Sequence, residues 1–124
     1  MAILTNYDNF FLPADNLDLA KKFYIDTLEL ETKFDFSDMG MTAFKVGDNE
    51  PAIILSTRPQ AQPAIWFTVE NVNQAYHTLK QKGISFLGAP FEIATGWAVE
   101  FNDPFGNRLG LTDYSKTEAT SKEA

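Results

Sequence analysis

Two short, mostly apolar stretches of the chain, 9–14 and 64–69, predict two β-strands. Each stretch is followed by an acidic residue and an asparagine, and then by apolar residues that recur at helical spacing. The two stretches align without a gap at an offset of 55 residues (70 minus 15), with Asp15 opposite Glu70. The pattern therefore predicts an internal repeat of strand, break and helix.

The two predicted helices carry start and stop signals. Asn71 is the expected N-cap of the second helix, and Gly83 is its expected C-terminal stop. Asp15 or Asn16 caps the first helix, whereas its end is unusual because Glu29 stands where glycine is easiest. The expected apolar stripes are Leu17, Ala20, Phe23, Tyr24 and Leu28 in the first helix, and Val72, Ala75, Tyr76 and Leu79 in the second.

Three short strand-like runs come after each helix, with turn residues between them. The runs are 31–36, 41–46, 51–57, 84–86, 97–101 and 107–112. Asp-Pro-Phe-Gly-Asn at 103–107 has proline early and glycine late, as in a tight reversal. We expect one domain over residues 1–114, with modules at about 5–57 and 63–114, and a disordered polar tail over 115–124.

This order predicts an α+β fold in which each half is a βαβββ module. Because one module leaves sheet edges unpaired, we expect two modules to combine into a cupped mixed β-sheet with the helices on the outer face. Alternation then assigns the faces. The residues expected to face the helices are Phe10, Leu12, Ala14, Ile65, Phe67, Val69, Val99, Phe101, Leu109 and Leu111. Those expected to line the cup are Asn9, Phe11, Pro13, Ala64, Trp66, Thr68, Ala98, Glu100, Gly110 and Thr112.

Composition narrows the classes of function. The chain is 44% hydrophobic and 22% charged, which is typical of a globular domain. Cysteine is absent, which excludes disulfides, thiol nucleophiles and thiolate metal sites and fits a reducing, cytoplasmic location. The net charge of −7 disfavours nucleic acid as a partner. We expect no signal peptide and no membrane partner, because no apolar run is long enough to span a bilayer.

Three stretches resemble the vicinal oxygen chelate superfamily, which includes glyoxalase I, extradiol dioxygenases, fosfomycin-resistance enzymes and bleomycin-binding proteins. They are residues 15–30 with a Phe-Tyr pair, residues 67–83, and residues 101–110 with a turn close to the Asp-Pro-x-Gly-Asn turn of the superfamily. The last motif is the most specific, and the resemblance spans residues 9–112. The resemblance implies paired βαβββ modules and often a homodimer.

The resemblance also locates the positions that hold a metal ion in metal-dependent members. Its first-strand ligand falls on Asn9, the ligand that opens the second module falls on Ala64, and the glutamate of the last strand falls on Gly110. The remaining ligand falls within 53–55, where every residue is apolar. Because metal sites need several convergent His, carboxylate or thiolate groups, we expect no metal and no cofactor. The single histidine, His77, lies off its helix's apolar stripe and is expected to be solvated.

The inner face supplies the candidate ligand-binding residues. Phe11 and Trp66 are suited to stacking on a planar ligand, although filling of the cup or a dimer contact explains them equally well. The Glu100 carboxylate can meet a cationic ligand, accept a hydrogen bond or act as a general base, whereas an ion pair with Arg108 is the plainer interpretation. The candidates are Asn9, Phe11, Trp66, Thr68, Trp97 and Glu100, with no catalytic residue assigned.

These residues support three functional hypotheses. The first is a metal-free protein, similar in character to bleomycin-resistance proteins, that sequesters a small molecule in an aromatic groove, commonly one built between two subunits. The alternative is a metal-dependent lyase, isomerase or dioxygenase-type enzyme of the same superfamily with displaced ligands, using Glu100, Asn9 or Glu92. The third is a non-catalytic partner subunit whose cup is filled by its own side chains. Elemental analysis separates the first two, and a structure without a cavity favours the third.

Overall fold

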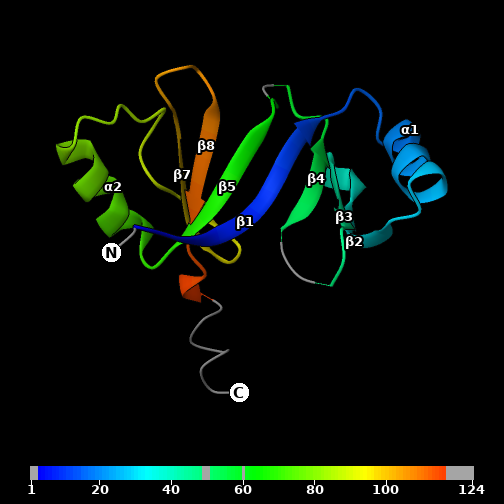
Figure 1. Ribbon diagram of the computed structural model, residues 1–124, viewed down its shortest axis with the longest axis horizontal. Coiled ribbons are helices and arrows are strands. Elements are labelled where there is room, and N and C mark those ends of the chain that lie inside the picture. Colours follow the sequence, from blue (N-terminus) through cyan, green and yellow to red (C-terminus); the bar gives the residue numbers. More distant parts are fainter. Residues whose placement is uncertain (1–2, 49–50, 60, 117–124) are drawn as a thin grey trace. The chain divides into compact units, whose positions relative to one another are not determined.

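The computed structural model describes residues 3–48, 51–59 and 61–116. Along these residues the elements are β1 (Leu4–Pro13), α1 (Leu17–Lys21), η1 (Lys22–Thr27), β2 (Glu31–Phe36), η2 (Ser37–Met39), β3 (Met41–Lys45), β4 (Ala52–Ser56), β5 (Ala64–Val69), α2 (Val72–Gln81), β6 (Phe91–Ile93), β7 (Gly96–Asn102) and β8 (Arg108–Thr112) (Figure 1). The strands form a mixed sheet in the order β2-β3-β4-β1-β5-β8-β7-β6. The predicted α+β class and the repeated βαβββ order are confirmed.

The chain divides into two structural units. The first unit is residues 8–65, and the second comprises the residues before Asp8 and after Ile65. The division falls inside β1 and inside β5, and not in the proline-rich link at 58–63. The beginning of β1 therefore belongs with the second module, because Ile3 and Leu4 pack against the core of the second unit.

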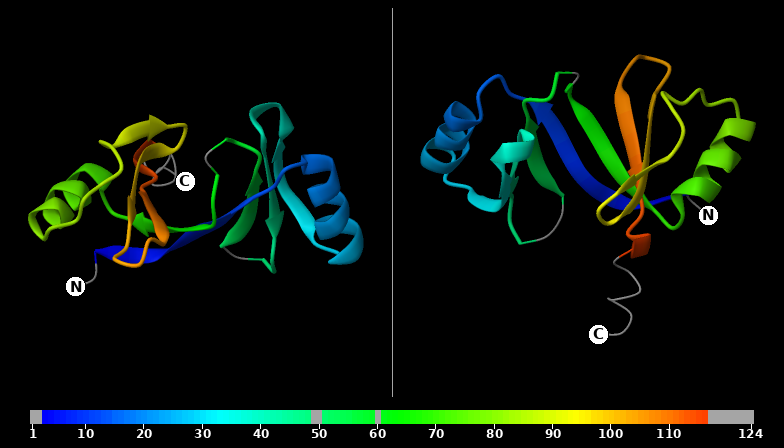
Figure 2. Two further views of the ribbon diagram at one scale, coloured as in Figure 1. Left: turned by 90° about the horizontal axis from the view of Figure 1, so that it is seen from above. Right: turned by 180° about the vertical axis from the view of Figure 1, so that it is seen from behind.

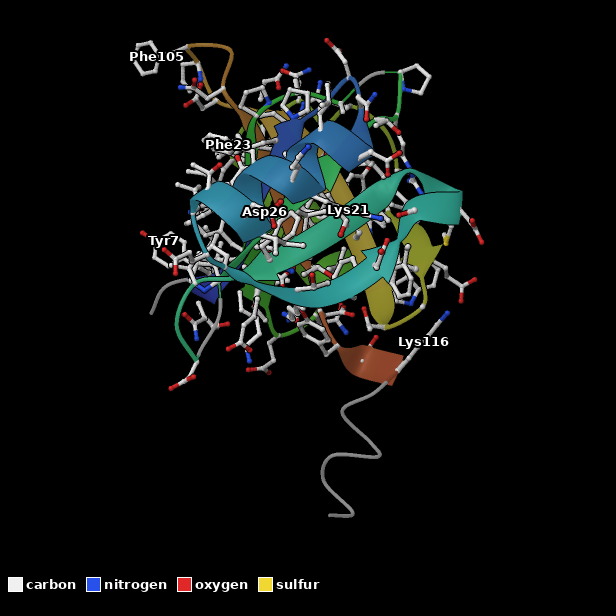
Figure 3. The ribbon with its side chains drawn as sticks, turned by 90° about the vertical axis from the view of Figure 1, so that its right-hand side faces the viewer. Tyr7, Lys21, Phe23, Asp26, Phe105 and Lys116 are labelled. Carbon is white, nitrogen blue, oxygen red and sulfur yellow. The ribbon has the colours of Figure 1, made fainter. Side chains whose placement is uncertain are left out.

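Helix α1 of the first unit covers one face of strands β2, β3 and β4 (Figure 2). The ring of Tyr24 stacks on that of Phe44 with centroids 5.1 Å apart, which identifies this face. Phe44 is in register with Ile53, and Ile53 with Phe10, so Phe10 faces the helix as predicted. Lys21, which is labelled in Figure 3, adds an ion pair to Asp35 of β2, with 2.8 Å between nitrogen and oxygen.

The N-termini of the two helices repeat in atomic detail. Asn16 accepts a hydrogen bond from the backbone N–H of Leu19 at 3.0 Å, and Asn71 accepts one from Gln74 at 2.9 Å. Both asparagines have φ −148° and ψ 115°. An N-cap of this kind is worth about 1 kcal/mol relative to alanine. The two asparagines, 55 residues apart in sequence (71 minus 16), are thus equivalent caps of a genuine internal repeat.

The C-terminal halves of the helices differ from each other, and here one prediction is wrong. After α1 the chain continues as the π-helical segment η1, in which the Leu28 N–H donates to the Phe23 carbonyl. The prediction that Phe23 and Leu28 belong to the apolar stripe is wrong, because these residues are 49% and 47% exposed, whereas Tyr24 stacks on Phe44. Glu29 then adopts a left-handed φ of 60°, whereas Gly83 (φ 100°) ends the second helix as predicted.

The core of the second unit lies between α2 and the strands. Its buried members are Val69, Val72, Ala75, Val99, Phe101 and Leu111, and Phe67, Tyr76, Leu79, Phe86, Trp97 and Leu109 pack against them. These strand residues are the ones that alternation assigns to the helix side, which confirms that part of the predicted register. Ile65 is the exception in β5, because its side chain is 40% exposed.

One predicted strand is misplaced. The sequence pattern predicts a strand at 84–86, but only Phe86 forms a single bridge, to Phe101 of β7. The strand that pairs with β7 on the side away from β8 is instead β6, in which Phe91 lies opposite Ala98. Ile84 and Phe86 pack against the core without continuous strand pairing, which explains why their apolar pattern resembles that of a strand.

The turn before β8 presents an aromatic side chain to solvent. The Asp103 carboxylate accepts hydrogen bonds from the backbone N–H groups of Phe105 and Asn107 at 2.8 and 2.9 Å, and Gly106 has a left-handed φ of 87°. The Phe105 side chain is 86% exposed and projects from the turn (Figure 3). The predicted tight reversal is confirmed, and its asparagine and aspartate fix the loop without help from the core.

The Asp113 carboxylate connects the start of α2 to the sheet of the second unit through hydrogen bonds. One oxygen accepts a hydrogen bond from the Val72 N–H at 2.8 Å, and the other accepts bonds from the Trp97 N–H at 3.0 Å and the Ser115 hydroxyl at 2.8 Å. Gly96 has no room for a Cβ because this carboxylate lies against it. Asp113 thereby links β7, β8 and the positive end of the α2 dipole.

The chain after β8 begins in an ordered arrangement. Lys116 forms an ion pair with Glu92, with 2.8 Å between nitrogen and oxygen, and its N–H donates to the Thr95 carbonyl. The expected disordered tail therefore does not start at Ser115, and residues 117–124 lie outside the described residues. None of the described helices is long and apolar enough to cross a membrane.

Replacing Asp113 by alanine is expected to reduce the free energy of unfolding by about 3 kcal/mol, because buried N–H groups lose a charged acceptor. Burial raises the pKa of Asp113, but the hydrogen bonds from Val72, Ser115 and Trp97 outweigh it and hold this pKa below its usual value. Stabilisation by Asp113 is therefore complete above an unfolded-state pKa of about 4 and is lost as the pH falls through the lower folded-state value.

Urea unfolding at pH 7 and at low pH measures both effects. Asp48→Ala, in the exposed turn after β3, is the control and should change the free energy of unfolding by less than about 0.5 kcal/mol. An Asp113→Ala variant as stable as the parent at pH 7 would contradict the role of this carboxylate.

Candidate functional site

The second unit has a face of β5, β7 and β8 opposite the one that packs on α2, and Trp66 lies on this face. A Cβ placed on Gly110 would lie 2.6 Å from the indole Nε1 of Trp66 and nearer still to the fused ring carbons. The indole therefore lies directly on the Gly110 backbone, where only glycine fits. Trp66, Gly110 and the strands that carry them all belong to the second unit.

Glu100 lies next to this indole. It is in register with Gly110 across the β7–β8 pair, so its side chain is on the same face as Trp66. Of its side chain, 29% is exposed. Burial raises the pKa of Glu100, and the nearby Arg108 guanidinium opposes part of that rise. The site thus contains a partly desolvated carboxylate against an aromatic ring.

The side chain of Arg108 is directed mainly by a residue that is not among the sequence-based candidates. Its Nε donates a hydrogen bond to the Asn102 Oδ1 at 3.1 Å, whereas its Nη1 lies 3.9 Å from the nearest Glu100 carboxylate oxygen. Asn102 is in register with Arg108. Continuing the alternation of 98 and 100 to position 102 would have found this asparagine in the sequence. Asn102, Arg108 and Glu100 form a polar row beside the Trp66 indole.

Thr68 is the residue after Trp66 on the same face by strand alternation. It is partly buried, and its backbone carbonyl accepts a hydrogen bond from the Thr5 hydroxyl at 2.9 Å. Of the predicted candidates, the structure thus brings Trp66, Thr68 and Glu100 to one face of one unit.

Asn9 and Phe11 belong to the first unit. Phe11 is in register with Ile54, and Ile54 with Ala43, on the strand face opposite the one that Tyr24 and α1 cover. Asn9 accepts a hydrogen bond from the Ala52 N–H at 3.1 Å and donates one to the Asp8 carboxylate at 3.2 Å. The expectation that Asn9 and Phe11 share a hollow with Trp66 stays a prediction.

Trp97 does not join the other candidates. It packs against the core of the second unit beneath α2, with Val72 and Ala75 of the helix in the same cluster. The side chain of the next residue in β7, Ala98, points to the other face, as alternation requires. The position of Trp97 next to Gly96 suggests that it lies at the rim of the site. Strand alternation instead predicts that it faces the helix, and the structure agrees with this prediction.

Sequence comparison identifies the family. The profile of the Glyoxalase/Bleomycin resistance protein/Dioxygenase superfamily matches residues 6–111. The chain belongs to this superfamily. No curated protein sequence matches the chain significantly.

Solved structures share the glyoxalase superfamily fold with the chain at low sequence identity. Methylmalonyl-CoA epimerase from Mycobacterium tuberculosis has a TM-score of 0.73 and 15% identity, covering 97% of this chain and 95% of its own. A superfamily member from Vibrio splendidus 12B01 has a TM-score of 0.70 and 12% identity, covering 88% and 99%. A Streptomyces coelicolor methylmalonyl-CoA epimerase variant in complex with 2-nitronate-propionyl-CoA has a TM-score of 0.68 and 20% identity, covering 90% and 99%.

The residues present do not fit the metal ion that the glyoxalase superfamily implies. By the superfamily resemblance the last-strand ligand position falls on Gly110, and the Trp66 indole fills the space that a side chain there would need. At the first-strand position, the Asn9 oxygen already accepts the Ala52 N–H. Residues 3–48, 51–59 and 61–116 contain no group of three or more His, Cys, Asp or Glu able to hold a metal.

We expect Gly110→Ala to reduce the free energy of unfolding by about 1–3 kcal/mol, because the added methyl group overlaps a rigid ring. The same substitution made in a Trp66→Ala background is expected to cost much less, since the obstructing ring is gone. Unfolding of the parent, the two single variants and the double variant forms a double-mutant cycle that measures this coupling.

Gly88→Ala is the matched control, because nothing lies within 4 Å of a Cβ at that position. It is expected to leave stability within about 0.5 kcal/mol of the parent. Equal costs of Gly110→Ala with and without Trp66 would show that the indole does not occupy this position.

Proposed function

We propose that this protein binds a small molecule on the helix-free face of β5, β7 and β8, and does so without a metal ion held by the protein. The observation that carries the proposal is the Trp66 indole on Gly110. In metal-dependent members of the superfamily this position supplies a carboxylate ligand, and here an aromatic surface stands in its place. An aromatic ring on an otherwise polar face favours stacking on a planar or apolar group, worth about 0.5–1.5 kcal/mol beyond its buried area.

The polar row beside the indole supports recognition as well as burial. Glu100 offers acceptor oxygens, Arg108 offers donors, and Asn102 fixes the guanidinium by the bond at 3.1 Å. Ligand sites typically combine an apolar surface with a few directional polar groups. Sequestration of the ligand is the function that this combination supports best, since it requires no reacting group.

An isomerase-type enzyme is the second candidate, and one observation favours it. Burial raises the pKa of Glu100, as suits a carboxylate that takes up a proton from a substrate. The methylmalonyl-CoA epimerases named above share the fold, but identities of 15% and 20% do not carry their activity to this chain. Turnover of a bound ligand that is lost in Glu100→Gln, with binding retained, would favour this candidate.

Fluorescence of Trp66 provides the direct test of the binding site. The chain contains two tryptophans, so Trp97→Phe leaves Trp66 as the single reporter on the proposed face. Screening a library of planar small molecules against this variant is expected to yield ligands that quench or shift the Trp66 emission. Trp66→Ala, in the otherwise unchanged chain, is expected to weaken their binding at least about tenfold by calorimetry.

The control for this experiment is Trp97→Phe itself, compared with the parent chain by calorimetry. Because Trp97 packs in the core beneath α2, its replacement is expected to leave affinity unchanged. Ligands that bind Trp66→Ala as tightly as the parent would place binding elsewhere and overturn the proposal.

Metal analysis tests the other half of the proposal. Protein purified without chelators, and protein incubated with Zn²⁺, Ni²⁺, Mn²⁺ or Fe²⁺ and then desalted, is expected to contain far less than one ion per chain. Ligand binding is expected to be unchanged by EDTA. A stoichiometric divalent ion would favour the metal-dependent enzyme with displaced ligands instead.

We also infer a homodimer and a cytoplasmic location, which rest on the superfamily resemblance and on the absence of cysteine. Sedimentation velocity of the purified chain is the measurement for the first. The small-molecule site described here lies within one unit and does not require either inference.

A further inference from the structure

We infer that the ligand carries a protonated nitrogen, an ammonium or amidinium group, which donates to the Glu100 carboxylate while a flat part of the ligand meets Trp66. This inference rests on the proposed function and names the chemical class of its ligand. In this inference, Glu100 selects ligands by their charge, and Trp66 binds the flat part of the ligand.

The hydrogen bonding of the polar row is the first argument. Arg108 is the cation nearest to Glu100, yet its Nη1 lies 3.9 Å from the carboxylate, beyond hydrogen-bond distance. The guanidinium is instead committed to Asn102 through the bond from Nε at 3.1 Å. Among the residues that the structure describes, no donor reaches the Glu100 carboxylate within 3.5 Å. The carboxylate therefore retains acceptor sites that a ligand can fill.

Partial burial of this carboxylate is the second argument. The Trp66 ring lies on Gly110, the register partner of Glu100, and the Glu100 side chain is only 29% exposed. A carboxylate that has lost water without gaining a donor carries an unfavourable desolvation energy. A ligand N–H offsets that energy, and a charged donor does so about twice as well as a neutral one.

The charge of the whole chain is the third argument. With a net charge of −7, the protein attracts cations and repels anions at long range. The Arg108 guanidinium opposes this locally, but its orientation toward Asn102 leaves the carboxylate as the group that borders the Trp66 indole. Because the Arg108 Nη1 lies 3.9 Å from a Glu100 carboxylate oxygen, an anionic ligand bound to that nitrogen would be repelled by Glu100 at close range.

Three flat probes of equal size and different charge test the inference: benzamidine, which is cationic, benzamide, which is neutral, and benzoate, which is anionic. Their affinities are measured by quenching of Trp66 in the Trp97→Phe chain, and again after Glu100→Gln. Benzamidine is expected to bind the tightest, and Glu100→Gln is expected to weaken it roughly ten- to hundredfold, the range expected for a lost charged hydrogen bond.

Glu92→Gln is the matched control. Glu92 is in register with Trp97, which places it on the helix side of the sheet, and its carboxylate pairs with Lys116 at 2.8 Å. The Glu92→Gln substitution removes one negative charge, as Glu100→Gln does, but from the neighbouring strand. Because salt screens charges at this range, it is expected to leave the affinity for benzamidine within about twofold of that of the parent. A loss equal to that of Glu100→Gln would mean that net charge alone attracts the probe, and would overturn the inference.

Other outcomes separate this inference from the proposed function. Equal binding of all three probes, weakened by Trp66→Ala and unaffected by Glu100→Gln, overturns the selection of charge and leaves the binding site in place. Tight binding of benzoate that is lost in Arg108→Gln assigns selection to the guanidinium and also overturns it. If none of the probes perturbs Trp66 fluorescence or the thermal midpoint, both the inference and the proposed site fail.

Discussion

The packing of the Trp66 indole on the Gly110 backbone determines the properties of the proposed site. Because the ring occupies the space of a side chain at Gly110, β8 can contribute no ligand atom there. The same ring lies beside Glu100, which is in register with that glycine across β7 and β8. One aromatic residue thus fills the space of a side chain at Gly110 and lies beside a partly buried carboxylate.

The internal repeat explains why two units built from one pattern can differ in this way. Asn16 and Asn71 cap their helices with the same backbone geometry, so the start of each module is fixed locally. The C-terminal half of each helix is less constrained. The first helix becomes π-helical and ends at Glu29 with a φ of 60°, whereas the second ends conventionally at Gly83. The shared features are those that local hydrogen bonds dictate, and the divergent ones depend on packing.

Most of the fold could be predicted from the sequence because its signals are local: alternation, caps and turn residues. Predictions failed where a tertiary contact decided the outcome. Phe86 has the pattern of a strand residue but packs against the core with a single bridge, and Phe23 is half exposed in a π-helical segment that no spacing rule reveals. For the site, alternation placed Trp66 and Glu100 on one face, but it gave no sign that the indole reaches Gly110. Side-chain reach across strands is not encoded in a period of two.

The polar row also shows how a site can hold a charge without neutralising it. Had Arg108 paired closely with Glu100, the two would form an ordinary partly exposed ion pair of little energetic consequence. Instead, Asn102, the register partner of Arg108 on β7, accepts the hydrogen bond from Nε, and Nη1 lies 3.9 Å from Glu100. The carboxylate then bears a desolvation energy that Arg108 offsets only in part. Folding does not require such an arrangement, since an apolar residue at position 100 would satisfy a partly buried strand at least as well. A group that is kept at a cost to stability, beside an aromatic ring on the face without a helix, is best explained by a ligand that completes its hydrogen bonds.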